Sequence, residues 1–523
     1  QPRKELTMLA RATRKKVGEN VCVGNLFLPV PNTDFREFLD EVDKMARSSP
    51  EIIDSIEKDL NRNAREKKSL RLADKKFFES QTDDLPTMNI REQTVLAEEL
   101  DLAVGRPRMT GYAVYMFLML RGFLGSLTAK PAWRFLRESM SLHVFLQDRG
   151  LSMPAETTMM ENVNLVSNAT RELIFDKEIA LILKEGLDDF KSLTIDSTAV
   201  KANSSWPTDA KILTGLLMRA NRLGQQVHSF GLEDFRQGWV PRWLEEMDKL
   251  EFQICLAAGK ANSKGKMKRH YRQLLNRGRK ATNVLTTELN RLEHGHPLER
   301  QAPSRRVLLA RVLQQIKADL VDANRVLEYA DDRVFHDKVL PSTQKVLSLS
   351  DGSAAYIQKG SRNPLIGYKP QMVRSENGFV TSLIVPQGNA ADASKLVPTV
   401  SDSITRTCVV PNLVSTDDGY ASAKGRDEVL GMGVKVISIS GAKGKKLTDP
   451  CDWDSEEYRD ARRNRSAVES LMFTIKDGFE FGTLGRRGLD AVRAELLEKV
   501  LAYNCCRIIL MRQRKREELE KAA

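Results

Sequence analysis

Apolar residues follow two different patterns along the chain. Around 191–206, and again from about 346 onward, short runs of alternating or continuous apolar residues predict β-strands. In the rest of the chain, apolar residues recur every three or four positions between charged ones, which is typical of helices with one buried face. These patterns predict an α/β domain combined with regions that are entirely helical.

The predicted α/β domain starts with a single strand, and a hairpin follows later in the chain. The first strand begins at Lys191 and ends on Asp196, and the hairpin strands are 368–373 and 379–385. They flank Asn377-Gly378, a dipeptide typical of tight turns between antiparallel strands. The later elements are a helix at 393–404, a strand at 412–416, a helix at 422–430, a strand at 434–439 and helices at about 455–477 and 487–518. This order predicts a mixed sheet covered by helices, which fits the ribonuclease-H-like topology.

Three other regions carry helical patterns only. Residues 1–84 are charge-rich and predict an N-terminal accessory region. Residues 85–190 predict short helices that fit either a helix-turn-helix-like DNA-binding domain or a plain helical bundle. Residues 207–345 predict an all-α insertion domain, so the α/β domain consists of 191–206 and 346–523. The tryptophans near or within the insertion are interpreted as core residues, with stacking on an unpaired base as the alternative: Trp206, Trp239 and Trp243.

The charge balance favours a polyanionic partner. The chain has 82 Lys and Arg against 70 Asp and Glu, a net charge of +12, and basic proteins of this kind commonly bind nucleic acid. Its densest basic stretch, 260–280, predicts either a DNA-gripping surface or a solvated helical face, and it includes Lys266, Lys268, Arg269 and Arg272. We expect no membrane span and no secretory signal, and the six cysteines favour reduced thiols.

Three carboxylates occupy positions from which they can meet at one edge of the predicted sheet. Asp196 ends the first strand, Asp417 follows a later strand, and Glu469 lies beside the apolar stripe of a helix, where it would need a partner or a metal. Oxygen-only ligation suits Mg²⁺ or Mn²⁺, and two such ions support phosphodiester displacement. Each acid alone has a plainer interpretation, as a turn former or as a surface ion pair with Arg465 or Lys476. The order of all three favours a metal site.

The motifs around these acids resemble those of a known family. Asp417-Asp418-Gly419-Tyr420 resembles the Asp-x-Gly-Tyr around the second catalytic aspartate of bacterial insertion-sequence DDE transposases. The segment 196–203 resembles their first motif. Their Tyr-Arg-Glu-Lys signature is matched at three of its four positions, by Arg465, Glu469 and Lys476. The resemblance covers roughly 85–206 and 346–510, and it includes Asn504 and Arg507 in the last helix.

The resemblance implies a DDE transposase with a ribonuclease-H-like catalytic core. Asp196, Asp417 and Glu469 would be its catalytic residues and the ligands of two Mg²⁺ or Mn²⁺ ions in each active site. Its partners would be double-stranded DNA, as terminal inverted repeats and as target, and a second copy of the chain in a synaptic complex. Such a protein would be bacterial and cytoplasmic, and associated with the nucleoid when bound to DNA. The DNA-contacting residues would be Lys201, Arg462, Arg465, Lys476, Lys266, Lys268, Arg269 and Arg272.

Some features depart from the family pattern. Arg462 stands where the signature has its tyrosine, and Asp196 and Asp417 are 221 positions apart because the helical insertion separates them. Asp351 and Asp418 are rival acids in turn-like contexts. Two other functions stay open: a related metal-dependent nuclease that does not join ends, and a domesticated, non-catalytic protein that binds or bridges DNA.

Overall fold

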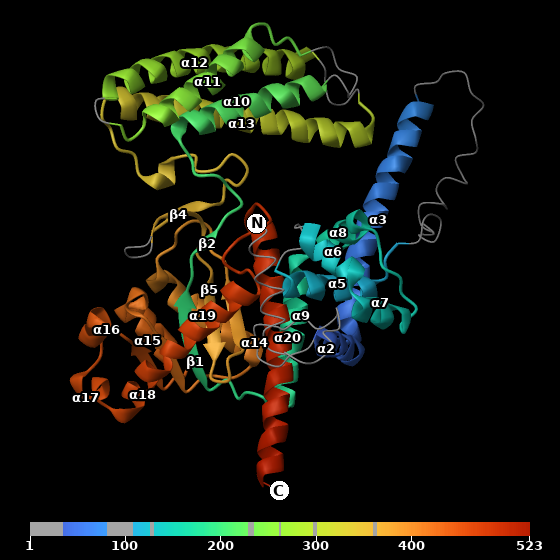
Figure 1. Cartoon of the computed structure of the whole chain (residues 1–523), viewed down its shortest axis with the longest axis vertical. Helices are drawn as coiled ribbons and strands as arrows, with labels where there is room; N and C mark the ends of the chain where they lie inside the picture. Colours follow the sequence, from blue (N-terminus) through green and yellow to red (C-terminus); the bar gives the residue numbers. More distant parts are fainter. Residues whose placement is uncertain are drawn as a thin grey trace, which may run out of the picture. The chain divides into compact units, whose positions relative to one another are not determined.

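The computed structural model describes residues 35–80, 108–125, 130–227, 235–260, 263–295, 301–358 and 363–522 (Figure 1). The chain divides into two compact units. The first unit comprises Gln1–Asn61, Arg106–Asn203 and Ile357–Ala523, and the second comprises Arg62–Gly105 and Ser204–Tyr356. Among the described helices, none is both long enough and apolar enough to cross a membrane.

The first unit contains a mixed five-stranded sheet. Its strands are β1 (Ser192–Ser197), β5 (Gln371–Ser375), β6 (Val380–Ile384), β7 (Leu413–Thr416) and β8 (Val436–Ile439), in the order β6-β5-β1-β7-β8. β1, β7 and β8 run parallel to one another, whereas β5 is antiparallel to both β1 and β6. The mixed α/β sheet is therefore confirmed, and so are the predicted strands except the one at 368–373.

The predicted strand at 368–373 is divided in the structure. Its first residue ends β4 (Leu365–Tyr368), which belongs to a second sheet with the order β2-β4-β3. The partners of β4 in that sheet are β2 (Val200–Lys201) and β3 (Ala355–Ile357). Pro370 separates β4 from β5 and has no backbone N–H to continue a ladder, which explains the break.

The last helix, α20 (Leu489–Ala522), holds the β5–β6 hairpin by its turn. Gly378 has a φ of +88°, a conformation that favours glycine, and its carbonyl accepts a hydrogen bond from the Tyr503 hydroxyl at 2.8 Å. Asn504 bonds both backbone groups of Val380, at 3.0 and 2.9 Å. Arg507 Nε donates to the Asn377 carbonyl at 2.6 Å. Asn504 and Arg507 of α20 thus hold the backbone of the hairpin turn and of the first residue of β6.

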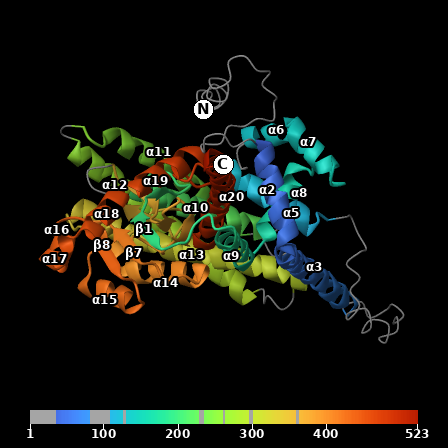
Figure 2. The same ribbon diagram turned by 90° about the horizontal axis from the view of Figure 1, so that it is seen from below.

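Helices cover both faces of the sheet (Figure 2). α14 (Leu396–Thr407) and α15 (Ala423–Gly431) pack on one face, around a core that includes Ile195, Val373 and Val414. α18 (Glu456–Asn464), α19 (Ser466–Gly478) and α20 pack on the other face. The single helix predicted at 455–477 is therefore two helices that meet at Arg465, and the short helices α16 (Ala442–Leu447) and α17 (Pro450–Trp453) precede them.

The N-terminal helices of the first unit pack around α5 (Gly111–Phe123), which is buried except for Tyr112. Because α5 is buried against α20, it cannot enter a DNA groove in this arrangement. An N-terminal helical region is confirmed, whereas a helix-turn-helix role for it stays a prediction. The other helices are α2 (Phe35–Ser48), α3 (Pro50–Glu79), which continues into the second unit, α6 (Lys130–Glu138), α7 (Met140–Gln147), α8 (Glu156–Leu165) and α9 (Asn168–Lys184).

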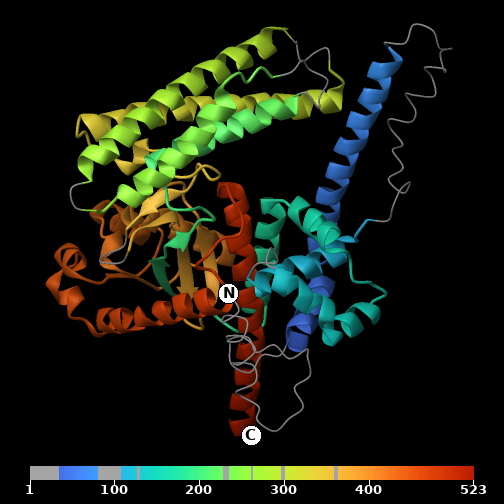
Figure 3. The ribbon, with the colours of Figure 1, turned by 45° about the horizontal axis from the view of Figure 1, so that its top comes forward.

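The second unit is built mainly from four long helices that lie side by side (Figure 3). They are α10 (Asp209–Gln226), α11 (Val240–Ala257), α12 (Lys264–Gly295) and α13 (Pro303–Phe335), and a short 3₁₀ helix, Ser342–Gln344, follows. Trp243 packs against their apolar core. The interpretation of the other two tryptophans as core residues is wrong, because Trp206 is 54% and Trp239 is 61% exposed. Trp206 precedes α10 and Trp239 is the N-cap of α11, so neither lies on the apolar face of a helix.

Candidate active site

Two of the predicted acids are aligned at the ends of neighbouring parallel strands. In the β1–β7 ladder, Ser192 lies opposite Leu413 and Thr194 lies opposite Ser415. Asp196 and Asp417 each lie two residues beyond the last pair, and Asp417 keeps an extended backbone. Continuing the register places the two aspartates side by side, at the strand spacing of about 4.8 Å.

The pleat also decides which face of the sheet the two aspartates share. Side chains alternate along a strand, so Asp196 and Asp417 point to the same face as Thr194 and Ser415. The Ser415 hydroxyl donates to the Ala461 carbonyl of α18 at 2.9 Å, which identifies this face as the one covered by α18 and α19. Both carboxylates are half-buried. The pair therefore lies at the edge of the sheet below the helix that carries Glu469.

The two rival acids have other roles. Asp418 Oδ1 accepts backbone hydrogen bonds from Lys443 at 2.8 Å and Gly444 at 3.0 Å, so it caps the start of α16. Asp417 Oδ1 instead accepts from Gly419 N at 3.0 Å, in the turn that opens the 3₁₀ helix η5 (Asp418–Tyr420). Asp351 belongs to the second unit, in the turn before β3. These contacts favour Asp417 over Asp418 as the acid of the motif.

One further acid near Asp196 and Asp417 was not predicted from the sequence. Asp392 begins the 3₁₀ helix η4 (Asp392–Lys395), which contacts η5. Its Oδ1 accepts from Lys369 Nζ at 2.8 Å and from Gln371 Nε2 at 3.0 Å. In the sequence, Asp392 looks like an ordinary acid at the start of a helix, and only the register of β1 with β5 brings Gln371 beside Ser197.

The surroundings of the buried Tyr420 hydroxyl indicate that the carboxylates of Asp196, Asp417 and Asp392 lie close together. Tyr420 lies in the core under the sheet edge, and its hydroxyl donates to Gln371 Oε1. Burial raises the pKa of Tyr420 far above its ordinary range, and the negative charges of Asp392, Asp196 and Asp417 raise it further. The strand edge thus carries an excess of negative charge, and its carboxylate oxygens are the ligand type that Mg²⁺ and Mn²⁺ prefer.

Glu469 lies differently from what its position in the helix suggests. Its side chain is 68% exposed and pairs with Arg465 at 3.3 Å, so the expected desolvation of this carboxylate is wrong. The buried residues of α19 are Val468, Leu471 and Ile475. Within the described parts of the chain, no three His, Cys, Asp or Glu side chains are grouped closely enough to hold a metal ion. The structure therefore aligns Asp196 with Asp417 and leaves Glu469 on the solvent side of its helix.

The basic residues expected to contact DNA fall into separate groups. The backbone of β2 brings Lys201 and Lys476 to the same loop, because Lys201 N donates to Gly482 O at 3.0 Å and Lys476 Cγ is 3.9 Å from the position of a Cβ on Gly482. Arg462 packs inward, with its guanidinium 4.1 Å from the Trp453 ring centre and a 2.8 Å hydrogen bond to the Trp453 carbonyl. Its proposed contact with phosphate has to compete with this packing.

On α12, three of the predicted basic residues are exposed and lie on one side of the helix: Lys266, Arg269 and Arg272. Lys268 is half-buried on the same helix. Within the described residues, no acidic side chain pairs with Lys266, Lys268 or Arg269. Arg272 lies over the Phe335 ring, at 5.4 Å from its centre. Among the residues that the structure describes, this basic face of α12 is therefore not neutralised by acidic side chains.

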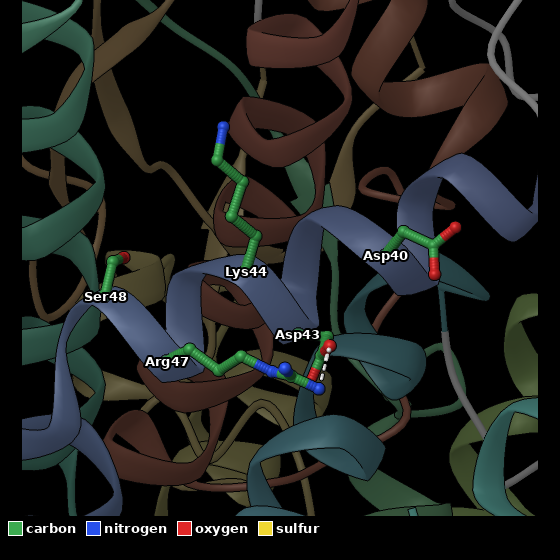
Figure 4. Close-up of a pocket in the computed structure, with 5 residues that line it drawn as sticks. All are labelled: Asp40, Asp43, Lys44, Arg47 and Ser48. Atoms are coloured by element: carbon green, nitrogen blue, oxygen red, sulfur yellow. Dashed lines mark ion pairs between the residues drawn. The ribbon is translucent and has the colours of Figure 1, made fainter. Parts of the chain in front are cut away.

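A pocket on α2 is lined by residues that are not among the predicted site residues (Figure 4). Its lining is Asp40, Asp43, Lys44, Arg47 and Ser48, with Arg47 and Asp43 paired at 3.0 Å. Asp43 also accepts hydrogen bonds from Arg149 and Tyr112, at 2.6 and 2.5 Å. Its carboxylate is therefore used to join α2 to α5 and to the segment after α7.

Comparison with known proteins identifies a segment in the C-terminal part of the chain. Residues 342–505 match the family model described as transposase DDE domain. The chain carries a transposase DDE domain. No curated protein and no solved structure matches the chain.

The family match bears out the resemblance to insertion-sequence DDE transposases that the motifs indicated. The matched segment includes Asp417 and Glu469, whereas Asp196 lies outside it. The structure closes that gap, because β1 lies between β5 and β7, two strands of the matched domain. Asp196 thus belongs to the middle strand of this sheet, although the helical segment separates it in sequence from the matched residues.

Proposed function

We propose that this chain is a DNA transposase that cuts at the terminal inverted repeats of a transposon and joins the freed 3′-OH to target DNA. The observation that carries the proposal is the register of β1 with β7, which continues to Asp196 beside Asp417, an acid of the segment that matches the transposase DDE domain. Two aspartates at adjacent strand ends suit a site that binds divalent cations on one side of a sheet.

The sheet itself supports a ribonuclease-H-like core. Its strand order is β6-β5-β1-β7-β8, with β5 antiparallel to its central neighbour β1, so the sheet is mixed as such a core requires. Chain order gives the same result, since a strand, a hairpin and two further parallel strands with helices between them build the sheet. We extend this to the proposed domain organisation, in which 207–345 is an insertion between the first strand and the hairpin.

In the proposed site, Asp196 and Asp417 hold Mg²⁺ or Mn²⁺, and Glu469 completes the ligand set. When bound, two such ions activate the attacking oxygen and stabilise the leaving 3′-oxygen. Glu469 can change partner at low cost, because an exposed ion pair such as the one with Arg465 contributes at most about 1 kcal/mol. Once Glu469 turns to the metal site, Arg465 is available for a phosphate of the DNA backbone.

DNA contacts are proposed for two surfaces of the chain. Lys201 and Lys476 border the same loop of the first unit and would bind the DNA backbone near the cut. The basic face of α12 would bind the backbone elsewhere, by charge and independently of base sequence. Pairing of two transposon ends requires two copies of the chain, so we also propose a homodimer in the DNA complex, acting in the bacterial cytoplasm.

The proposal is tested with labelled duplexes that cover the DNA flanking the coding sequence, incubated with Mg²⁺ or Mn²⁺ and a target plasmid. The wild type is compared with Glu469→Gln and with Glu457→Gln, a matched exposed acid one helix earlier. We expect metal-dependent cutting and joining by the wild type and Glu457→Gln, and DNA binding without cutting by Glu469→Gln.

Other results point to the other functions. Cutting without joining to the plasmid would show a related nuclease. Tight DNA binding with no cutting by any of the three proteins would show a domesticated DNA-binding protein. Equal cutting by the wild type and Glu469→Gln would remove Glu469 from the ligand set.

A further inference from the structure

An ion pair near Asp196 and Asp417 is not part of the proposed ligand set. Lys369 and Asp392 are joined at 2.8 Å, and their side chains are only 12% and 11% exposed. A largely buried pair has to offset the desolvation of both charges, so it contributes little net stability. Stability alone therefore does not explain an ion pair at this edge of the sheet.

The pair is linked to Asp417 through the two residues that complete its motif. Tyr420 donates its hydroxyl hydrogen to Gln371, and Gln371 donates in turn to Asp392 at 3.0 Å. A Cβ on Gly419 would lie 3.0 Å from Asp417 Oδ1 and 3.1 Å from Asp392 Oδ2. Gly419 is therefore lodged between the two carboxylates, and a larger residue there would push at least one of them away.

We propose that Asp392 is a positioning residue of the active site, which holds the Asp417 segment in place and keeps the ammonium of Lys369 away from Asp196 and Asp417. This inference rests on the proposed metal-dependent function, because it concerns how the segments around the two aspartates are held in place. It adds Asp392, Lys369 and Gln371 to the residues on which the site depends.

The position of Lys369 explains why its charge needs a dedicated partner. Lys369 precedes Pro370, whose carbonyl accepts from Thr198 N at 3.1 Å, two residues after Asp196. An ammonium group released at this edge would pair with the nearest remaining carboxylates and compete with a divalent cation for them. Asp392 prevents this competition by engaging Lys369 Nζ.

The test measures binding of Mn²⁺ alone, by the thermal stabilisation of the full chain without DNA, in parallel with metal-dependent DNA cleavage. Asp392→Asn keeps the shape of the side chain but releases Lys369. We expect the Mn²⁺ concentration for half-maximal stabilisation to rise about tenfold, equivalent to about 1.4 kcal/mol. The same shift should appear in the metal dependence of cleavage, while DNA affinity stays unchanged.

Two further variants separate this role from a merely structural one. Lys369→Met in the Asp392→Asn background removes the competing cation and should return the Mn²⁺ midpoint towards the wild-type value. Lys369→Met alone should lower the midpoint, because Asp392 then keeps an unpaired negative charge. Asp402→Asn is the matched control, since Asp402 pairs with Arg406 at 3.1 Å on α14, and it should leave the midpoint unchanged.

A wild-type midpoint in Asp392→Asn would overturn the inference, and so would a double variant that is no better than Asp392→Asn. In both cases Mn²⁺ binding and cleavage by the wild type would keep the proposed function intact. If the wild type neither binds Mn²⁺ nor cleaves DNA, the proposed function fails and this inference fails with it.

Discussion

Two groups of acidic side chains in the first unit are built in opposite ways. Glu498 is 1% exposed, and its carboxylate accepts hydrogen bonds at 2.6–2.8 Å from three arginines: Arg121, Arg171 and Arg486. At the sheet edge, the carboxylates of Asp196, Asp417 and Asp392 lie near the Tyr420 hydroxyl, and Lys369 forms an ion pair with Asp392.

The two groups differ in how far arginines neutralise their carboxylates. Burial raises the pKa of Glu498, but the three arginines outweigh burial and lower it below its ordinary range. That site holds α5, α9 and α20 together and has no capacity for another cation. At the sheet edge, by contrast, three carboxylates lie near one buried hydroxyl, and grouped negative charges of this kind are what a divalent cation can neutralise.

The largest effect on stability is expected at the neutralised acid. Glu498→Gln leaves three arginines, of which Arg121 and Arg171 are buried, around a neutral side chain. The loss in unfolding free energy should be about 3–5 kcal/mol, as for other buried pairs that lose one partner. Urea unfolding measures it. A loss below about 1 kcal/mol would break the comparison, and Asp196→Asn should show no such loss.

A second neutralised acid gives a pH-dependent effect of intermediate size. Burial raises the pKa of Asp43, but hydrogen bonds from Arg149, Tyr112 and Arg47 outweigh it and lower the pKa to about 2. Since an unfolded aspartate titrates near about 3.9, the folded form gains about 2 kcal/mol above that pH. This gain is lost as the pH falls towards 2. The stability difference between wild type and Asp43→Asn should therefore shrink between about pH 5 and pH 2, and a constant difference would contradict the assignment.

Substitution of Asp418 should lower stability and keep metal binding, whereas substitution of Asp417 should do the reverse. Asp418→Asn weakens the cap of α16 and should cost about 1 kcal/mol of stability, with metal binding kept. Asp417→Asn should keep stability and lose the stabilisation by Mn²⁺. Thermal unfolding with and without Mn²⁺ measures both changes. If only Asp418→Asn lost the stabilisation by Mn²⁺, the metal ligand would be Asp418 and not Asp417.

The smallest effect on stability is expected on α12. Changing Lys266, Arg269 and Arg272 to Gln should alter stability by less than about 0.5 kcal/mol, because all three are exposed. DNA binding should weaken for every sequence, with the salt dependence falling by about 0.9 for each lost phosphate contact. The control changes three exposed basic residues of α13: Arg305, Arg311 and Lys317. Equal loss in both variants would show a general charge effect.

Much of the sheet could be predicted because strands carry local signals. Asn377-Gly378 between two apolar runs gave the hairpin, and the apolar run that ends before Asp417 gave β7. The division between β4 and β5 was missed, because the chain changes sheets at Pro370 without interrupting its apolar pattern. The break at Arg465 was missed for a similar reason, since helical spacing continues from α18 into α19.

The site could be predicted only where the residues follow strands. The alignment of Asp196 with Asp417 could be expected because each follows a strand and the two strands are neighbours in the sheet, whereas their catalytic role stays a prediction. Asp392 was missed because its partners, Lys369 and Gln371, come from another element and meet it only in the folded chain. The exposure of Glu469 was also misjudged, because residues on either side of a buried stripe cannot be separated by spacing alone.

The most direct test of the central claim is metal-dependent cleavage of a labelled duplex from the flanking DNA by wild type, Asp196→Asn and Asp417→Asn. The account predicts cutting by the wild type only with Mg²⁺ or Mn²⁺, and wild-type DNA affinity without cutting for both variants. Cutting by either variant at the wild-type rate would show that the aligned aspartates are not the metal site.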